Sequence, residues 1–251
     1  MPYGDRYVEI VLDLIDHRVL VTSTDGRSRV LELTHRPACA DVYHDLLAAL
    51  SALDVEVEIH AEPFDLGESP PFAEDRIHDA YDADAVTRFW RVLASTERVL
   101  ARFRGGFAGK ASPVHLFWHS FDLAHARYSG RRAPVAADAD PVTAEAYSHE
   151  VIAFGFWPGD DRRTPFPAFY SYTAPEPEGL AGRPLEPAAA AWRDTGSGSL
   201  AVLPYDAVRE SPDPTGTLLA FFESAYLAGA QSAGWDLEQL ARTTASGRAG
   251  T

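Results

Sequence analysis

Three aromatic-rich segments in the second half of the chain constrain its fold most strongly. They are SPVHLFWHSFDLAHARYSGRR (112–132), EAYSHEVIAFGFWPG (145–159) and PFPAFYSYTAPEPEG (165–179). Apolar and polar residues alternate along 114–122, 149–157 and 167–173, and this period of two predicts strands, which we expect to belong to one sheet. Polar groups in so apolar a sheet are costly unless they are paired, so their presence here indicates a site.

The remaining patterns predict further strands and three principal helices. Strands are predicted at 7–15, 19–24, 29–33, 55–60 and 200–204, and helices at 37–53, 84–104 and 215–233. Asp25-Gly26 joins two of the strands as a tight hairpin turn. The first sixty residues therefore form a β-β-β-α-β unit, and the fold class is α+β with a mostly antiparallel sheet.

The domain organisation follows from where the patterns end. We predict a single α+β domain over residues 1–242, with residues 1–60 as a separable part. Residues 243–251 are small and polar, which predicts a disordered tail.

Charge and composition exclude several classes of partner. The formal net charge of -15 over 251 residues opposes binding to nucleic acid and to anionic membrane surfaces, which need a basic face. No apolar run approaches the roughly 20 residues that span a bilayer, and the N-terminus has no signal segment. Cys39 is the single cysteine, so an internal disulfide is excluded. We expect a soluble cytoplasmic protein without a cofactor.

His115 and His119 have the spacing of a metal site only on a helix. On a strand, four residues span about 13 Å, and one metal cannot bind both rings because Zn–N bonds are about 2 Å. A zinc site would need ligands from a neighbouring strand, and no C-x-x-C or H-E-x-x-H motif occurs. The sequence therefore predicts no metal.

His149 and Glu150 are neighbours on a predicted strand, so they point to opposite faces of the sheet. Ala153 and Gly155 leave room beside His149, as a ligand-facing surface requires. The alternative is a core histidine bonded to a backbone carbonyl.

The arginines of the segment RYSGRR offer closely spaced guanidinium groups. Arg127, Arg131 and Arg132 suit a carboxylate or phosphate on a small ligand. They equally suit internal salt bridges to Asp122 or Glu150.

Nearly the whole chain resembles an uncharacterised bacterial family, largely actinobacterial, known only as a domain of unknown function. The resemblance is carried by VHLFWHSFDLAHARYSGR, EAYSHEVIAFGFWPG and AFYSYTAPEP. It implies a shared fold but no activity. The matching positions that it marks as site candidates are His115, Asp122, Arg127, Ser148, His149, Glu150 and Tyr170.

Two departures from the family pattern affect these expectations. The family usually has glycine at the position of His119, which argues against His119 as a shared catalyst. Its members usually carry several dozen further residues ahead of the PYG motif. We therefore expect an exposed apolar patch on the β-β-β-α-β unit or on helix 84–104.

The function remains open between two classes. The first is a small-molecule-binding protein or enzyme, with His115, His149 and Glu150 as catalytic residues. The ligand would then be bound by Asp122, Arg127, Ser148 and Tyr170. The positive charge of Arg127 indicates that this ligand is anionic. The second is a non-catalytic interaction or dimerisation module, giving a homo-oligomer through an aromatic surface.

Overall fold

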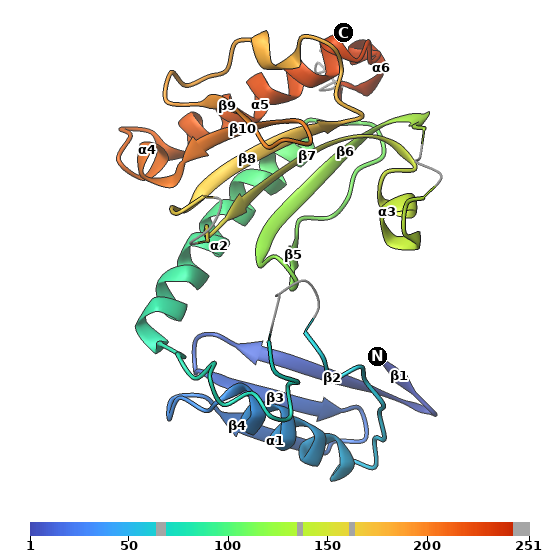
Figure 1. The fold of residues 1–251 in the computed structure, drawn as a ribbon, viewed down its shortest axis with the longest axis vertical. Helices are drawn as coiled ribbons and strands as arrows, with labels where there is room; N and C mark the ends of the chain where they lie inside the picture. The colour runs from blue at the N-terminus through green and yellow to red at the C-terminus, as the bar shows by residue number, and fades with distance from the viewer. Residues whose placement is uncertain (64–68, 135–137, 161–163, 243–251) are drawn as a thin grey trace, which may run out of the picture. The chain divides into compact units, whose positions relative to one another are not determined.

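The chain folds into two compact units, residues 1–92 and 93–251, in a computed structural model that describes residues 1–63, 69–134, 138–160 and 164–242 (Figure 1). The sequence predicts one domain with residues 1–60 separable, whereas the division falls inside a long helix, α2 (Ala83–Gly105). The tail predicted at 243–251 lies outside the described residues.

Unit 1 is an antiparallel sheet packed against one helix, α1 (Cys39–Ser51). Its strands are β1 (Pro2–Tyr3), β2 (Arg6–Asp13), β3 (Arg18–Ser23) and β4 (Ser28–Glu32), in that order. Alternation along β3 buries Val19 and Val21, which join Leu50 and Leu53 in the core of the unit. The predicted hairpin and the predicted helix are therefore confirmed.

The strand predicted at residues 55–60 is wrong. Val55 is buried in the core of unit 1, but Val57 and Ile59 are 45 % and 51 % exposed, and the segment has no strand assignment. The backbone N–H of Glu56 donates to the hydroxyl oxygen of Tyr3 at 3.0 Å instead of to a ladder partner. An alternating pattern forms a strand only where it pairs with a neighbouring strand, and residues 55–60 pair with no strand in the described part of the chain.

The face of this sheet opposite α1 carries an apolar row. Val11 pairs with Leu20 and Leu20 pairs with Val30, so the three side chains adjoin across three strands. Val30 is 51 % exposed. This row lies in the region where the family resemblance predicts exposed apolar surface.

Unit 2 is a six-stranded antiparallel sheet in the order β5-β6-β7-β8-β10-β9 (Figure 1). The strands are β5 (His115–Phe117), β6 (Asp122–Arg132), β7 (His149–Trp157), β8 (Ala168–Ala174), β9 (Ala191–Asp194) and β10 (Ser199–Pro204). The three aromatic-rich segments, 112–132, 145–159 and 165–179, therefore contribute strands to one sheet, as predicted. The stretch 114–122 is not one strand, because a turn follows Phe117 and the chain reverses at Phe121, whose φ is 60°.

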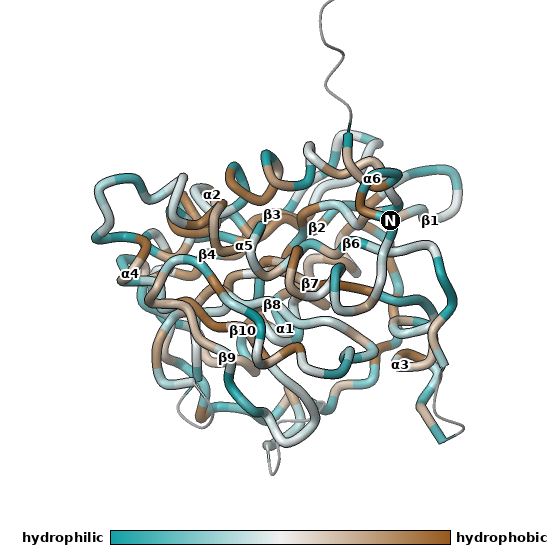
Figure 2. The backbone as a smooth tube through the Cα atoms, turned by 90° about the horizontal axis from the view of Figure 1, so that it is seen from above, coloured by the Kyte–Doolittle hydropathy of each residue, from teal (hydrophilic) through white to brown (hydrophobic). Residues whose placement is uncertain are grey.

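The back face of this sheet carries the core of unit 2. Helix α5 (Pro214–Ser232) and the end of α2 cover it, with Phe103, Phe154 and Phe222 in mutual ring contact. Helix α5 and strand β7 are predominantly hydrophobic along their lengths (Figure 2). Gly229 lets α5 approach closely, because a Cβ there would overlap the hydroxyl of Thr173 on β8. The three long helices match the three predicted ones within one or two residues at each end.

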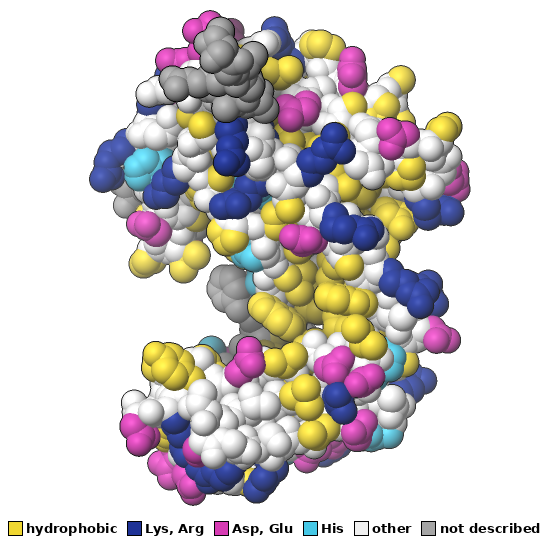
Figure 3. All heavy atoms as spheres, turned by 180° about the vertical axis from the view of Figure 1, so that it is seen from behind, with side chains coloured by type: hydrophobic (Ala, Val, Ile, Leu, Met, Phe, Trp, Pro, Cys, Tyr) yellow, Lys and Arg dark blue, Asp and Glu magenta, His cyan; other side chains and the backbone are white. Residues whose placement is uncertain are grey.

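Short elements complete unit 2. They are α3 (Pro141–Ala146), the 3-10 helix η1 (Leu180–Gly182), α4 (Tyr205–Arg209) and α6 (Leu237–Leu240). In the view of Figure 3, acidic and basic side chains are interspersed over unit 2 rather than gathered in one continuous patch.

Candidate functional site

The front face of the unit 2 sheet, opposite α5, carries a pocket of about 330 Å³ that we call the tyrosine pocket. Its aromatic lining comes from His115, Phe117, His125, Tyr128, Tyr147, Tyr170 and Tyr172. Strand alternation puts Asp122, Ala124, Ala126 and Tyr128 of β6 on this face. The pocket therefore arises where the sheet turns a polar and aromatic surface away from the helices.

Small residues form the floor of the tyrosine pocket. Ala124 and Ala126 on β6 pair with Gly155 and Ala153 on β7. Gly155 also pairs with Tyr170 on β8, and a Cβ at Gly155 would lie 2.6 Å from that ring. Glycine is thus what allows the Tyr170 ring to lie across β7.

Asp122 is the charged centre of the pocket and is 8 % exposed. The hydroxyl of Ser120 donates to its Oδ1, and the hydroxyl of Tyr170 donates to its Oδ2. Burial and the neighbouring Asp122 charge raise the pKa of Tyr170 well above its usual value. Tyr170 therefore remains a neutral donor to this side chain.

Tyr172 and Tyr147 form the far wall of the pocket. Their hydroxyl oxygens are 3.3 Å apart, and burial raises the pKa of Tyr172. Tyr147 immediately follows α3, which is fixed at its start by Asp140, whose side chain accepts from the backbone N–H of Val142 at 2.9 Å. A capped helix of six residues therefore positions this wall.

His115 contributes an imidazole to the rim of the pocket. Its Nδ1 lies 3.1 Å from the carbonyl oxygen of Pro113, and its ring centroid lies 4.3 Å from that of Phe117. The carbonyl accepts from Nδ1–H, so in the neutral ring Nε2 is the acceptor. His119 lies in the turn after β5, outside the residues that line the pocket.

Arg127 lies on the back face of the sheet, not in the pocket, and is 2 % exposed. Its guanidinium lies 3.4 Å from the ring centroid of Phe103 and 4.4 Å from that of Tyr226, and it donates to the Phe103 carbonyl. The internal salt bridge that the sequence allowed for Arg127 does not form in the described part of the chain, where no carboxylate lies within salt-bridge distance of it. Aromatic faces, a helix C-terminus and the charge of Glu223, which does not pair with it directly, stabilise the cation.

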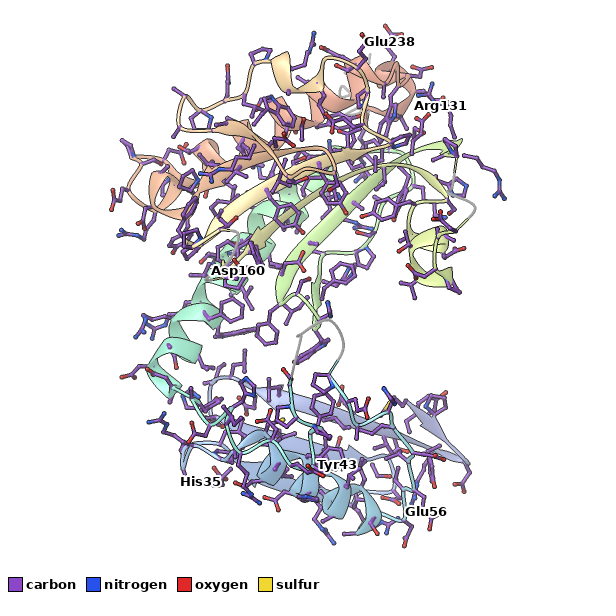
Figure 4. The ribbon with its side chains drawn as sticks, in the orientation of Figure 1. His35, Tyr43, Glu56, Arg131, Asp160 and Glu238 are labelled. Carbon is purple, nitrogen blue, oxygen red and sulfur yellow. The ribbon has the colours of Figure 1, made fainter. Side chains whose placement is uncertain are left out.

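Glu150 has the salt bridge that the sequence allowed, with Arg131 as its partner. Arg131 Nη2 lies 2.7 Å from Glu150 Oε2 and 2.6 Å from the carbonyl oxygen of Ala233. Arg131, labelled in Figure 4, thereby joins the end of β6 to the C-terminus of α5. Arg131 and Glu150 therefore bind each other, and Arg131 also connects β6 to α5.

Ser148 and His149 stand at the start of β7, and neither lines the tyrosine pocket. The Ser148 hydroxyl lies 3.0 Å from His149 Nδ1 and donates to the carbonyl of Glu145. Of the seven site candidates, the structure brings together His115, Asp122 and Tyr170. Arg127, Ser148, His149 and Glu150 lie elsewhere on the sheet.

Sequence reasoning missed Ser120, Tyr128, Tyr147 and Tyr172 as pocket residues. One signal was present, because Tyr170 and Tyr172 are two apart on a strand and so must share a face. The position of Tyr147 depends on the fold of α3, which no pattern predicted.

Two kinds of feature are absent from the described residues: a cluster of side chains that could bind a metal ion, and a helix that could cross a membrane. In residues 1–63, 69–134, 138–160 and 164–242, no group of three or more His, Cys, Asp or Glu side chains is arranged to bind a metal ion. Within the same ranges, no helix has the length and apolarity needed to cross a membrane.

Gly155→Ala is expected to lower the free energy of unfolding by about 1–3 kcal/mol, because the added methyl must displace the Tyr170 ring or the Leu123 backbone. Urea unfolding followed by tryptophan fluorescence measures this. Gly105→Ala is the matched control, since a Cβ there meets no atom within 4 Å. Equal unfolding midpoints for the two variants would show that Tyr170 does not lie against Gly155.

Comparison with known proteins gives family membership without an activity. A family model matches residues 1–242, and its description states that the function is unknown. No curated protein and no solved structure matches the chain.

Proposed function

The chain belongs to DUF5996, a family of unknown function, and we propose that this member binds a small organic cation in the tyrosine pocket. The observation that carries the proposal is the buried Asp122 carboxylate among four tyrosines, in a lining without lysine or arginine. An aromatic wall around one negative charge is the arrangement that favours ammonium groups.

The acceptor capacity of Asp122 supports this ligand class. Each carboxylate oxygen has two lone pairs, and the hydroxyls of Ser120 and Tyr170 use one on each. An ammonium N–H can therefore approach a charge that is already held in place. The raised pKa values of Tyr170 and Tyr172 keep both phenols neutral, so the rings offer faces to a cation without adding charge.

An anionic ligand, which the sequence predicted, has less support. Arg127 is enclosed on the other face of the sheet, and Arg131 is bound to Glu150 and to the end of α5. An anion in the tyrosine pocket would meet the Asp122 charge without a compensating cation from the lining. The volume of about 330 Å³ lies at the lower end of small-molecule sites, which run from about 300 to 1,000 Å³.

Isothermal titration calorimetry tests the proposal with choline, tyramine and butylamine against neutral alcohols and carboxylates of matched size. We expect the cations to bind and Asp122→Asn to weaken them at least tenfold, because the charge at the aromatic wall is removed. Asp206→Asn, in α4 and outside the pocket lining, is the control for net charge and should retain the affinity. Preferential binding of the carboxylates, or equal affinities for both variants, would contradict the proposal.

A second candidate function, self-association through an aromatic surface, draws on the turn between β5 and β6. Phe117, Trp118 and Phe121 are 47 %, 64 % and 36 % exposed there, within five residues. Exposed aromatic clusters of this kind are typical of interfaces. Sedimentation velocity of the wild-type protein and of Trp118→Ser measures self-association, which we expect the substitution to weaken. A monomer at every concentration for both proteins would exclude self-association through this surface.

A further inference from the structure

A second cavity adjoins the tyrosine pocket on the same face of the sheet. This distal pocket has a volume of about 480 Å³ and lies between the end of β8 and the turn that joins β9 to β10. Tyr147 and Tyr172 line both cavities, so the two meet at this tyrosine pair. The tyrosine pair is therefore a wall common to both cavities.

Glu176 gives the distal pocket its charge. The backbone N–H of Ser199 donates to Glu176 Oε2 at 2.5 Å, and the Ser199 hydroxyl donates to Oε1 at 2.6 Å. These bonds orient the carboxylate and leave a lone pair on each oxygen. Glu176 is exposed, so its remaining acceptor positions are accessible to a ligand.

The other polar groups of the distal pocket are hydroxyls. Thr195, Ser197 and Ser199 line it, and the hydroxyl oxygens of Thr195 and Ser197 are 3.1 Å apart. As in the tyrosine pocket, no lysine or arginine contributes to the lining. The combined site thus has a carboxylate in each part, with aromatic rings between them.

We propose that the two pockets form one site for a linear ligand with a positive charge at each end, the chemistry of a diamine or polyamine. One ammonium binds Asp122 and the tyrosines, the methylene chain crosses the Tyr172 ring, and the second ammonium binds Glu176. The six residue-to-residue steps from Tyr170 to Glu176 span at most about 20–22 Å, which limits the ligand length. This inference rests on the proposed function, because it requires the first ammonium to bind at Asp122.

Calorimetry of the full-length chain with a length series tests the inference. The probes are butylamine and octylamine, α,ω-diamines of four to twelve carbons, and spermidine and spermine. We expect affinity to pass through an optimum with length and to exceed that of the equal-length monoamine at least tenfold. Glu176→Gln should lower the affinity of the best diamine to that of the monoamine and leave the monoamine unchanged.

The controls separate this inference from the proposed function. Glu178→Gln, two residues further along and outside both linings, should retain the diamine affinity. Monoamine binding that depends on Asp122, with no gain for diamines or no effect of Glu176→Gln, overturns the inference and leaves the proposed function standing. Failure of every amine to bind overturns both. Binding of neutral polyols rather than diamines in the distal pocket also overturns the inference.

Discussion

Replacing Arg127 by alanine is expected to lower the free energy of unfolding by about 4 kcal/mol. The side chain is 2 % exposed, and its guanidinium lies 3.4 Å from the Phe103 ring centroid, so truncation opens a large cavity inside the aromatic core. It also removes the donor to the Phe103 carbonyl at the end of α2. Urea unfolding followed by tryptophan fluorescence reports this, since four of the five tryptophans lie in unit 2.

Arg127→Met is the matched control, because it retains most of the volume and removes only the charge. Burial lowers the pKa of Arg127 to about 10, so the group is still a cation at neutral pH and bears a desolvation cost. Methionine fills most of the same space and removes the desolvation cost together with the charge, while Glu223 loses a nearby cation. We expect Arg127→Met to lower the free energy of unfolding by less than half as much as Arg127→Ala does. Wild-type stability in the alanine variant would mean that Arg127 is not enclosed by the aromatic rings.

Arg127 also shows why the sequence could not place the site completely. Along β6, one face carries Leu123, His125 and Arg127, and the other carries Asp122, Ala124 and Ala126. The usual rule puts the more apolar set inside, yet here Arg127 and the His125 ring contact Phe103 in the core, and the alanines face the pocket, which His125 lines in part. Alternation predicted which residues share a face, but the choice of inner face depends on the rings that α2 and α5 bring to it.

Other differences have the same origin in long-range contacts. The sheet of unit 2 was predictable because alternation is encoded locally in each strand. Residues 55–60 alternate equally well and form no strand, because pairing needs a partner that the segment itself does not specify. Tyr147 and Tyr172 meet across 25 residues of sequence, so no local pattern could predict their contact.

His125 is expected to make the stability of the protein depend on pH. It is 1 % exposed and its Nε2 has no hydrogen-bond partner among the residues that the structure describes, while its Nδ1 lies 3.1 Å from the Ser112 carbonyl oxygen. Burial, together with the Arg127 charge, lowers the pKa of His125 to about 4 in the folded chain. In the unfolded chain the His125 side chain has the ordinary histidine pKa of about 6.5. Between pH 4 and pH 6.5 the unfolded state therefore binds more protons than the folded state. The contribution of His125 to the free energy of unfolding is therefore fully present above about pH 6.5. It falls by about 3 kcal/mol as the pH drops to 4.

Urea midpoints of wild type and His125→Gln between pH 4.5 and 7.5 measure this dependence. The difference between the two proteins isolates His125, since every other titrating group is present in both. We expect the variant to lose most of the slope, because glutamine has no proton to bind in this range. His149→Gln is the matched control for the same substitution at a half-buried histidine that contacts Ser148 outside the aromatic core. A parallel pH profile for wild type and His125→Gln would show that the imidazole is hydrated rather than enclosed between Phe103 and Phe154.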